Sequence, residues 1–169
     1  MQTFLPCADF AATAAVLDPR RLGKQRVDAL QVLRALTRSG YGWQHHPAVR
    51  MWRGHAQAVA AYGLAICTEW TARGRADTCA ATIALDLAAA GEAPPRTQAE
   101  LAALGLLPPW LGDERVHRSH RRALLAKDPD HYGPLFPDDE PAAEYYWPPD
   151  PTASPRAQPQ GRPAAPRRR

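Results

Sequence analysis

Apolar residues recur at alternating steps of three and four along the stretch "HPAVRMWRGHAQAVAAYGLAICTEWTARG", which begins at His46. The stripe consists of Val49, Trp52, Ala56, Val59, Gly63, Ile66 and Trp70. This spacing puts one apolar face along an α-helix, and no alternating strand pattern occurs in the chain. We therefore predict an all-α fold around one long central helix that ends at Arg73-Gly74, in which Gly63 lets another backbone approach closely.

Capping residues and helix breakers predict the other helices. Asp18 is a suitable N-cap, Pro19 suits the first helical position, and Ser39-Gly40 is the expected stop. Further helices are expected to begin near Asp77 or Thr78, at the capping-box pair Thr97 and Glu100, and after Asp113, and to end at Gly91, before Gly105 and at Asp128-Pro129. These signals predict several helices that can pack together as one domain.

Length and composition favour a single domain. A chain of 169 residues, 45% of them apolar or aromatic, buries one core, which we place in residues 1–147. Residues 148–169 are rich in Pro and Arg and are expected to form a disordered tail. The chain contains no apolar run of about 18 residues and no signal peptide, so we expect a soluble, cytoplasmic protein without a membrane partner. Cys7, Cys67 and Cys79 are expected to be reduced, mostly buried thiols.

Basic residues are concentrated in blocks. The net charge of +4 arises in the tail, yet within the domain the range 20–53 contains a single acid, Asp28. Its cations are Arg20, Arg21, Lys24, Arg26, Arg34, Arg38, Arg50 and Arg53. A second block, from Arg115 to Lys127, adds five cations without an acid. Such blocks suit a polyanion such as DNA, and the alternative is a solvated basic surface.

The histidines offer few routes to metal chemistry. His117 and His120 lie three residues apart on a predicted helix, but no third ligand joins them, so we expect neither a metal nor another cofactor. His46 precedes Pro47 at a helix start, where an imidazole caps the helix or contacts a phosphate. The sequence leaves both roles open.

Several stretches resemble a known family. The basic segment "RRLGKQRV", the segment "CTEWTARGRADT" at the end of the long helix, and the late "DPDHYG" are similar to the pyrimidine-dimer DNA glycosylases of the phage endonuclease V type. The runs "MQTFLP", "HPAVRMWRG" and "PPWLGD" followed by "HRSHR" resemble an uncharacterised bacterial branch of that superfamily. The resemblance covers Met1 to about Trp147.

This resemblance implies an all-α domain that binds duplex DNA, flips a nucleotide and cleaves its glycosidic bond through an amine that forms a Schiff base. Such chemistry makes the chain a hydrolase and lyase of DNA repair, and it needs an amine, a carboxylate and phosphate-binding cations. The family uses the α-amine exposed when the initiator Met is removed, whereas the bulky Gln2 is expected to retain Met1 here. An arginine, Arg21, stands where the family has its catalytic Glu. Lys24 and Asp28 are therefore the candidate catalytic pair, and a plain i,i+4 ion pair is the alternative.

The remaining candidate site residues are expected to contact DNA. The phosphate-binding candidates are Arg20, Arg21, Arg26, His46, Arg118, Arg121 and Arg122. By similarity to a "YYG" run of the phage enzyme, Tyr132 stacks on a base or ribose, and the alternative is a buried tyrosine with a bonded hydroxyl. Two other functions stay open: a nucleic-acid-binding module without catalysis, and an enzyme that acts on a small phosphorylated or nucleotide ligand. The sequence carries no signal for the damaged base or for an oligomeric state.

Overall fold

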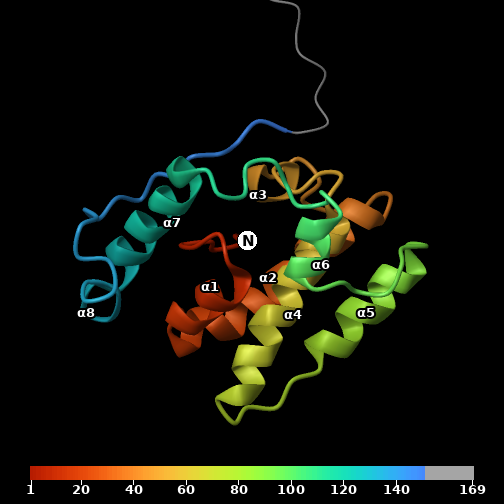
Figure 1. Ribbon diagram of the computed structural model, residues 1–169, viewed down its shortest axis with the longest axis horizontal. Helices are drawn as coiled ribbons and strands as arrows, with labels where there is room; N and C mark the ends of the chain where they lie inside the picture. Colours follow the sequence, from red (N-terminus) through yellow and green to blue (C-terminus); the bar gives the residue numbers. More distant parts are fainter. Residues whose placement is uncertain (151–169) are drawn as a thin grey trace, which may run out of the picture.

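The computed structural model describes residues 1–150, which contain eight helices and no strand (Figure 1). The helices are α1 (Phe10–Val16), α2 (Pro19–Thr37), α3 (Pro47–Arg50), α4 (Ala56–Ala72), α5 (Cys79–Ala89), α6 (Gln98–Ala103), α7 (Glu114–Lys127) and α8 (Pro129–Tyr132). The predicted all-α fold is confirmed.

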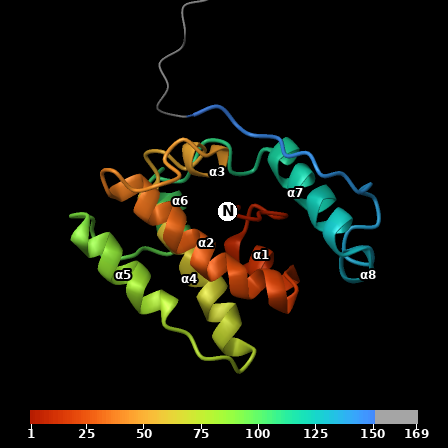
Figure 2. The same ribbon diagram turned by 180° about the vertical axis from the view of Figure 1, so that it is seen from behind.

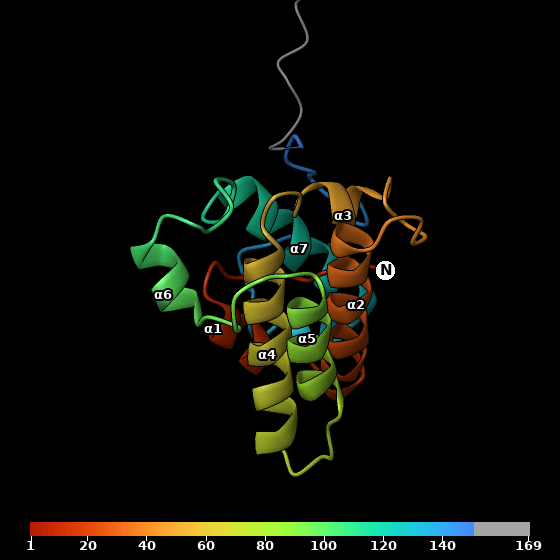
Figure 3. The ribbon, with the colours of Figure 1, turned by 90° about the vertical axis from the view of Figure 1, so that its right-hand side faces the viewer.

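Helices α2, α4 and α5 pack against one another and form the centre of the fold (Figure 3). They approach closely at Gly63 of α4, where a Cβ would lie 2.7 Å from Ile83 Cδ1 of α5 and 3.0 Å from Ala29 Cβ of α2. Any side chain at this position would push the helices apart. The role predicted for Gly63 is confirmed.

The long central helix predicted from the apolar stripe is wrong in one respect: the structure divides it into α3 and α4. Gly54 lies between the two helices and has a φ of 78°, a left-handed conformation that ends a right-handed helix. Val49 and Trp52, before the break, are as buried as Val59 and Ile66 after it. The stripe therefore reports burial correctly, although the backbone between its two parts is a turn.

Local capping signals are confirmed. Asp18 accepts hydrogen bonds from the backbone N–H groups of Arg20 and Arg21 at the start of α2. Thr97 and Glu100 form a reciprocal capping box on α6, and Asp113 caps α7. Helix α1, whose N-cap is the Asp9 side chain, was not predicted from the sequence.

The N-terminal segment, residues 2–6, runs between α7 on one side and the α2–α4 pair on the other (Figures 1 and 2). Thr3, Phe4 and Leu5 are buried, with exposed fractions of 0%, 6% and 0%. The segment belongs to no helix, so its backbone groups need partners from elsewhere. It therefore links the two sides of the fold through side-chain hydrogen bonds.

The cysteines were expected to be reduced and mostly buried. All three cysteines are free, and Cys67 is buried whereas Cys7 and Cys79 are partly exposed. Burial raises the pKa of Cys67 to about 12, so its thiol is inert.

The expected tail begins with a packed stretch, since Pro148 is buried and Arg53 pairs with Asp150. The remainder of the tail lies outside the described residues. Within residues 1–150, no helix is long and apolar enough to span a bilayer.

Candidate active site

A cleft of about 480 Å³ opens where the N-terminal segment meets the first turns of α2. Chain segments far apart in sequence form its wall: the N-terminus, α2, the end of α7 and the stretch after α8. The lining residues are Met1, Gln2, Phe4, Arg20, Arg21, Lys24, Asp28, Lys127 and Tyr145. The predicted catalytic pair and two of the predicted phosphate-binding arginines thus share one cleft.

Asp28 holds the central carboxylate of this cleft. Its side chain is 3% exposed, and both carboxylate oxygens lie 2.7 Å from the Nζ atom of Lys24, whose side chain is 61% exposed. The backbone N–H of Gln2 and the Nε2 of Gln25 each donate to Oδ2 over 3.4 Å. A buried carboxylate thus contacts the start of the chain and a solvent-accessible amine, which is more than a surface i,i+4 ion pair requires.

Side chains from α2, from α4 and from the turn before α4 fix the N-terminal segment beside Asp28. The backbone N–H of Phe4 donates to Gln25 Oε1 over 2.8 Å, and the Tyr62 hydroxyl lies 2.6 Å from that oxygen and 2.9 Å from the Phe4 carbonyl oxygen. Trp52 Nε1 donates to the Thr3 hydroxyl over 2.9 Å. These contacts keep Gln2 at the cleft.

The two histidines of the "HRSH" stretch bind Leu5 of the same segment. His120 Nδ1 accepts the Leu5 N–H over 2.8 Å, and His117 Nδ1 donates to the Leu5 carbonyl oxygen over 2.8 Å. His117 Nε2 accepts from the Gly112 N–H, so both of its ring nitrogens are used. His117 and His120 are therefore structural groups that position the chain, and the described residues contain no cluster of three or more groups suited to a metal ion.

Basic residues line the cleft together with Asp28. Arg20 is exposed, and no ion pair within residues 1–150 includes it. The chain has only two lysines among its 21 basic residues, and both Lys24 and Lys127 line this cleft. Because four basic residues line the cleft with one carboxylate, the cleft attracts anions such as phosphate. Sequence reasoning missed Lys127 and Tyr145, although the rarity of lysine was a usable signal.

Two other candidate residues lie outside the cleft. Arg26 pairs with Asp77 at 2.5 Å and its guanidinium lies over the ring of Trp70, 4.2 Å from the centroid. His46 caps α3 by accepting the Ala48 N–H at Nδ1, which matches the capping role that the sequence left open. Burial, and then the positive N-terminus, lower the pKa of His46, so its neutral form is favoured.

The arginines of α7 contact the acidic stretch that follows α8. Arg118 and Arg121 both pair with Asp139, at 3.0 and 2.5 Å, and Arg121 also pairs with Glu114. Arg122 donates to the carbonyl oxygen of Glu140. The structure therefore does not bring these arginines into the cleft, and DNA contact by this face stays a prediction that would require partial release of the acids.

Tyr132 is fully buried, with an exposed fraction of 0%. Its hydroxyl donates to Asp18 Oδ2 over 2.5 Å and accepts the Asp18 N–H over 3.2 Å, and Arg21 pairs with the same carboxylate at 2.7 Å. Burial would raise the pKa of Asp18, but hydrogen bonds from Arg21 and Tyr132 lower it to about 2. The structure thus shows the buried tyrosine with a bonded hydroxyl and leaves no ring face for a base.

We expect Tyr132→Phe to lower the free energy of unfolding by about 1–3 kcal/mol at pH 7, because Asp18 loses both a donor and an acceptor in a buried site. Urea denaturation measures this change. Tyr146→Phe is the control, at a half-buried ring that lies under the Arg115 guanidinium. Equal small effects in both variants would contradict the role given to the Tyr132 hydroxyl.

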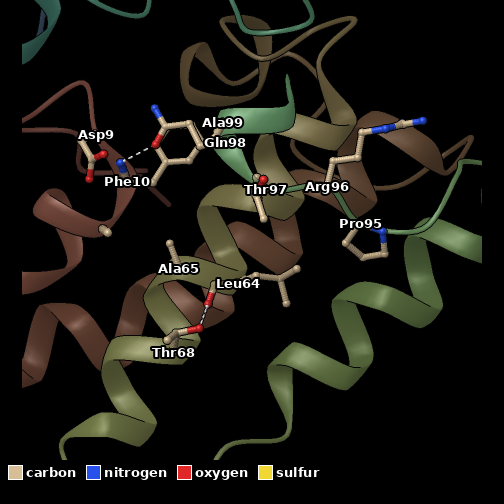
Figure 4. Close-up of a pocket in the computed structure, with 12 residues that line it drawn as sticks. Asp9, Phe10, Leu64, Ala65, Thr68, Pro95, Arg96, Thr97, Gln98 and Ala99 are labelled. Carbon is tan, nitrogen blue, oxygen red and sulfur yellow. Dashed lines mark hydrogen bonds between the residues drawn. The ribbon is translucent and has the colours of Figure 1, made fainter. Parts of the chain in front are cut away.

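A second cleft, of about 390 Å³, lies between α4 and α6 (Figure 4). Its lining is mostly apolar, and several of its polar groups already have internal partners: Gln98 accepts the Phe10 N–H and donates to the Ala8 carbonyl oxygen, and Thr68 donates to the Leu64 carbonyl oxygen. These bonds leave few groups for acid–base chemistry, so the cleft at Asp28 is the candidate active site.

One comparison with known proteins found a similar family. A family model described as pyrimidine dimer DNA glycosylase matches residues 1–83, which include the N-terminal segment and all of α2. No curated protein and no solved structure matches the chain significantly. The matched range contains Gln2, Lys24 and Asp28 but not Lys127 or Tyr145. Through residues 1–83, the chain is similar to the pyrimidine dimer DNA glycosylase family.

Proposed function

We propose that the chain is a DNA glycosylase with abasic-site lyase activity, in which Lys24 supplies the amine and Asp28 the carboxylate. One observation carries the proposal: the Lys24 ammonium lies 2.7 Å from both oxygens of a buried carboxylate, in a cleft open to solvent. The similarity of residues 1–83 to this family supports DNA as the substrate. The damaged base is proposed to be a pyrimidine dimer, which is the substrate in the family's description.

The reaction needs an amine without its proton. Asp28 accepts a proton from the Lys24 ammonium, and the free amine attacks C1′ of the damaged nucleotide while the bond from C1′ to the base breaks. The base leaves with the bonding electrons and takes the proton that Asp28 accepted. The C1′–O4′ bond then breaks and O4′ takes a proton from the attached nitrogen, which gives an imine. Loss of a C2′ proton and departure of the 3′-phosphate complete a β-elimination that breaks the DNA strand.

The cleft also provides groups that hold the DNA. Arg20 of α2 and Lys127 of α7 are exposed cations that line the cleft, and we assign them to the phosphates that flank the extruded nucleotide. Arg21 is held by Asp18 and Asp128, so its guanidinium presents a fixed positive charge at the cleft. The predicted roles of Arg20 and Arg21 as DNA contacts are retained in this proposal.

Borohydride trapping tests the proposal. Incubating the protein with borohydride and oligonucleotides that carry an abasic site or a pyrimidine dimer should give a covalent adduct, because borohydride reduces an imine to a stable amine. Mass spectrometry of the digested adduct should place it on Lys24. Lys24→Arg should abolish the adduct while retaining the charge, and Lys127→Arg is the matched control that should retain it.

Two other outcomes of the borohydride experiment also discriminate between the hypotheses. An adduct on the N-terminal residue would support the glycosylase and move the nucleophile to the chain's start, next to Asp28. A protein that binds the DNA without forming any adduct would contradict the proposal and favour a binding module.

A further inference from the structure

Trp43 combines two unusual properties. Its side chain is 59% exposed, although tryptophan is usually buried, and its φ of 72° is the only positive value at a non-glycine residue within the described residues. A bulky residue in the left-handed region is strained, and such strain persists only where the surrounding structure holds it. Gly42, immediately before Trp43, would take such a conformation without strain.

The loop around Trp43 is held firmly. The Gln44 side chain donates to the Arg38 carbonyl oxygen over 2.9 Å, Arg53 donates to the Gln44 carbonyl oxygen over 3.1 Å, and the His46 N–H donates to the Trp43 carbonyl oxygen over 2.8 Å. These three bonds fix the backbone while the indole ring points outward. The strain is therefore maintained by contacts that keep an aromatic ring in solvent.

A row of rings connects Trp43 to the candidate active site. Trp43 contacts His46 with ring centroids 5.6 Å apart, His46 contacts Trp147 at 6.3 Å, and Trp147 contacts Tyr145 at 5.5 Å. Tyr145 lines the cleft, and His46 is near enough to the N-terminus for that positive charge to contribute to the lowering of its pKa. The loop and the N-terminus lie on the same side of the molecule (Figures 2 and 3).

We propose that Trp43 is a nucleobase-stacking residue, whose indole ring packs against an unpaired base of the DNA held at the cleft. The inference rests on the proposed function, because flipping a nucleotide out of a duplex leaves bases without a neighbour. An exposed ring on a rigid backbone stacks at low entropic cost, and base–aromatic stacking tolerates any base. Arg50, exposed in the following helix and in no ion pair within residues 1–150, supplies a cation for the same strand.

Binding measurements with matched variants test the inference. A duplex with one unpaired 2-aminopurine serves as the probe, because stacking on an indole quenches its fluorescence. Trp43→Ala should weaken binding about 5- to 150-fold and abolish the quenching, whereas Trp43→Phe should retain most of the affinity. Leu104→Ala is the control, since Leu104 is 57% exposed and lies after α6, away from the row of rings.

Trp43→Gly separates stacking from a structural role. Glycine adopts the left-handed conformation without strain, so this variant should melt at a higher temperature than the parent and yet bind the probe as weakly as Trp43→Ala. If Trp43 only held the backbone of the loop, Trp43→Gly would bind and quench the probe as the parent does, and the stacking role would be overturned.

The remaining outcomes distinguish the two proposals. Unchanged affinity and quenching in Trp43→Ala, with a borohydride adduct in the parent, would overturn stacking alone. Loss of affinity and quenching in that variant, with no adduct in the parent, would support stacking and overturn the glycosylase. A parent that binds neither the probe nor lesion-bearing DNA would overturn both.

Discussion

Asp28→Asn should slow strand cleavage at an abasic site by about 10²- to 10⁴-fold, the usual contribution of a positioned acid–base group. Asparagine has the shape of aspartate and still accepts the Gln2 N–H, but it cannot take a proton from Lys24. The variant should fold, because the Lys24 side chain is 61% exposed and its unpaired ammonium is hydrated. Single-turnover gel assays on abasic-site duplexes measure the change.

Asp86→Asn is the matched control for this variant. Asp86 is also a buried carboxylate, and it pairs with two cations, Arg34 at 2.6 Å and Arg38 at 2.5 Å, but it does not line the cleft. Its replacement should lower stability and leave the cleavage rate of the folded protein unchanged. Equal rate losses in both variants would show that Asp28 acts through folding, and would contradict its assignment as the proton acceptor.

The predicted helices agree with the structure where the signals were local. Asp18 and Pro19 start α2, and Asp113 starts α7, because a cap depends on residues within one turn. The break between α3 and α4 was missed because the apolar stripe continues across it. The left-handed backbone conformation of Gly54 marks the turn there, and the residue type alone does not reveal that conformation.

The candidate site shows the same division between local and distant contacts. Lys24 and Asp28 are one helical turn apart, so their pairing was predictable from spacing. Lys127 and Tyr145 join them through tertiary folding across about a hundred residues, which no spacing rule describes. The α7 arginines were predicted to contact DNA, but their pairing with Asp139, which holds Arg118 and Arg121, comes from a distant part of the chain and was not predicted.

His120 should make the fold acid-sensitive between about pH 6.5 and 3. Burial, and then the proximity of His117, lower the pKa of His120 from 6.5 to about 3 in the folded chain. As the pH falls below 6.5, the unfolded chain binds a proton that the folded chain excludes, so the free energy of unfolding decreases. His120 alone should lower the free energy of unfolding by about 2 kcal/mol between pH 7 and pH 5, and by about 4–5 kcal/mol between pH 7 and pH 3.

His120→Leu should flatten this pH dependence. At pH 7 the free energy of unfolding of the variant should be about 1–3 kcal/mol lower than that of the parent, because the Leu5 N–H is left without its acceptor. The substitution also removes a buried Nε2 atom that has no partner within residues 1–150, which offsets part of this loss. Since the parent loses stability as the pH falls and the variant does so less, the two free energies of unfolding should converge near pH 5. Urea denaturation at a series of pH values measures both curves.

The surface variant His45→Gln is the control and should keep the slope of the parent. Asp18 adds a separate loss at lower pH, because its pKa of about 2 lies below its ordinary value of 3.8. That contribution is present above about pH 4 and is lost toward pH 2, so measurements between pH 7 and 4.5 leave Asp18 out. His46, whose pKa is also lowered, contributes equally to the parent and to His120→Leu, so the difference between the two curves reports His120. If His120→Leu kept the full slope in that range, the buried neutral imidazole that holds Leu5 would not be the source of the acid sensitivity.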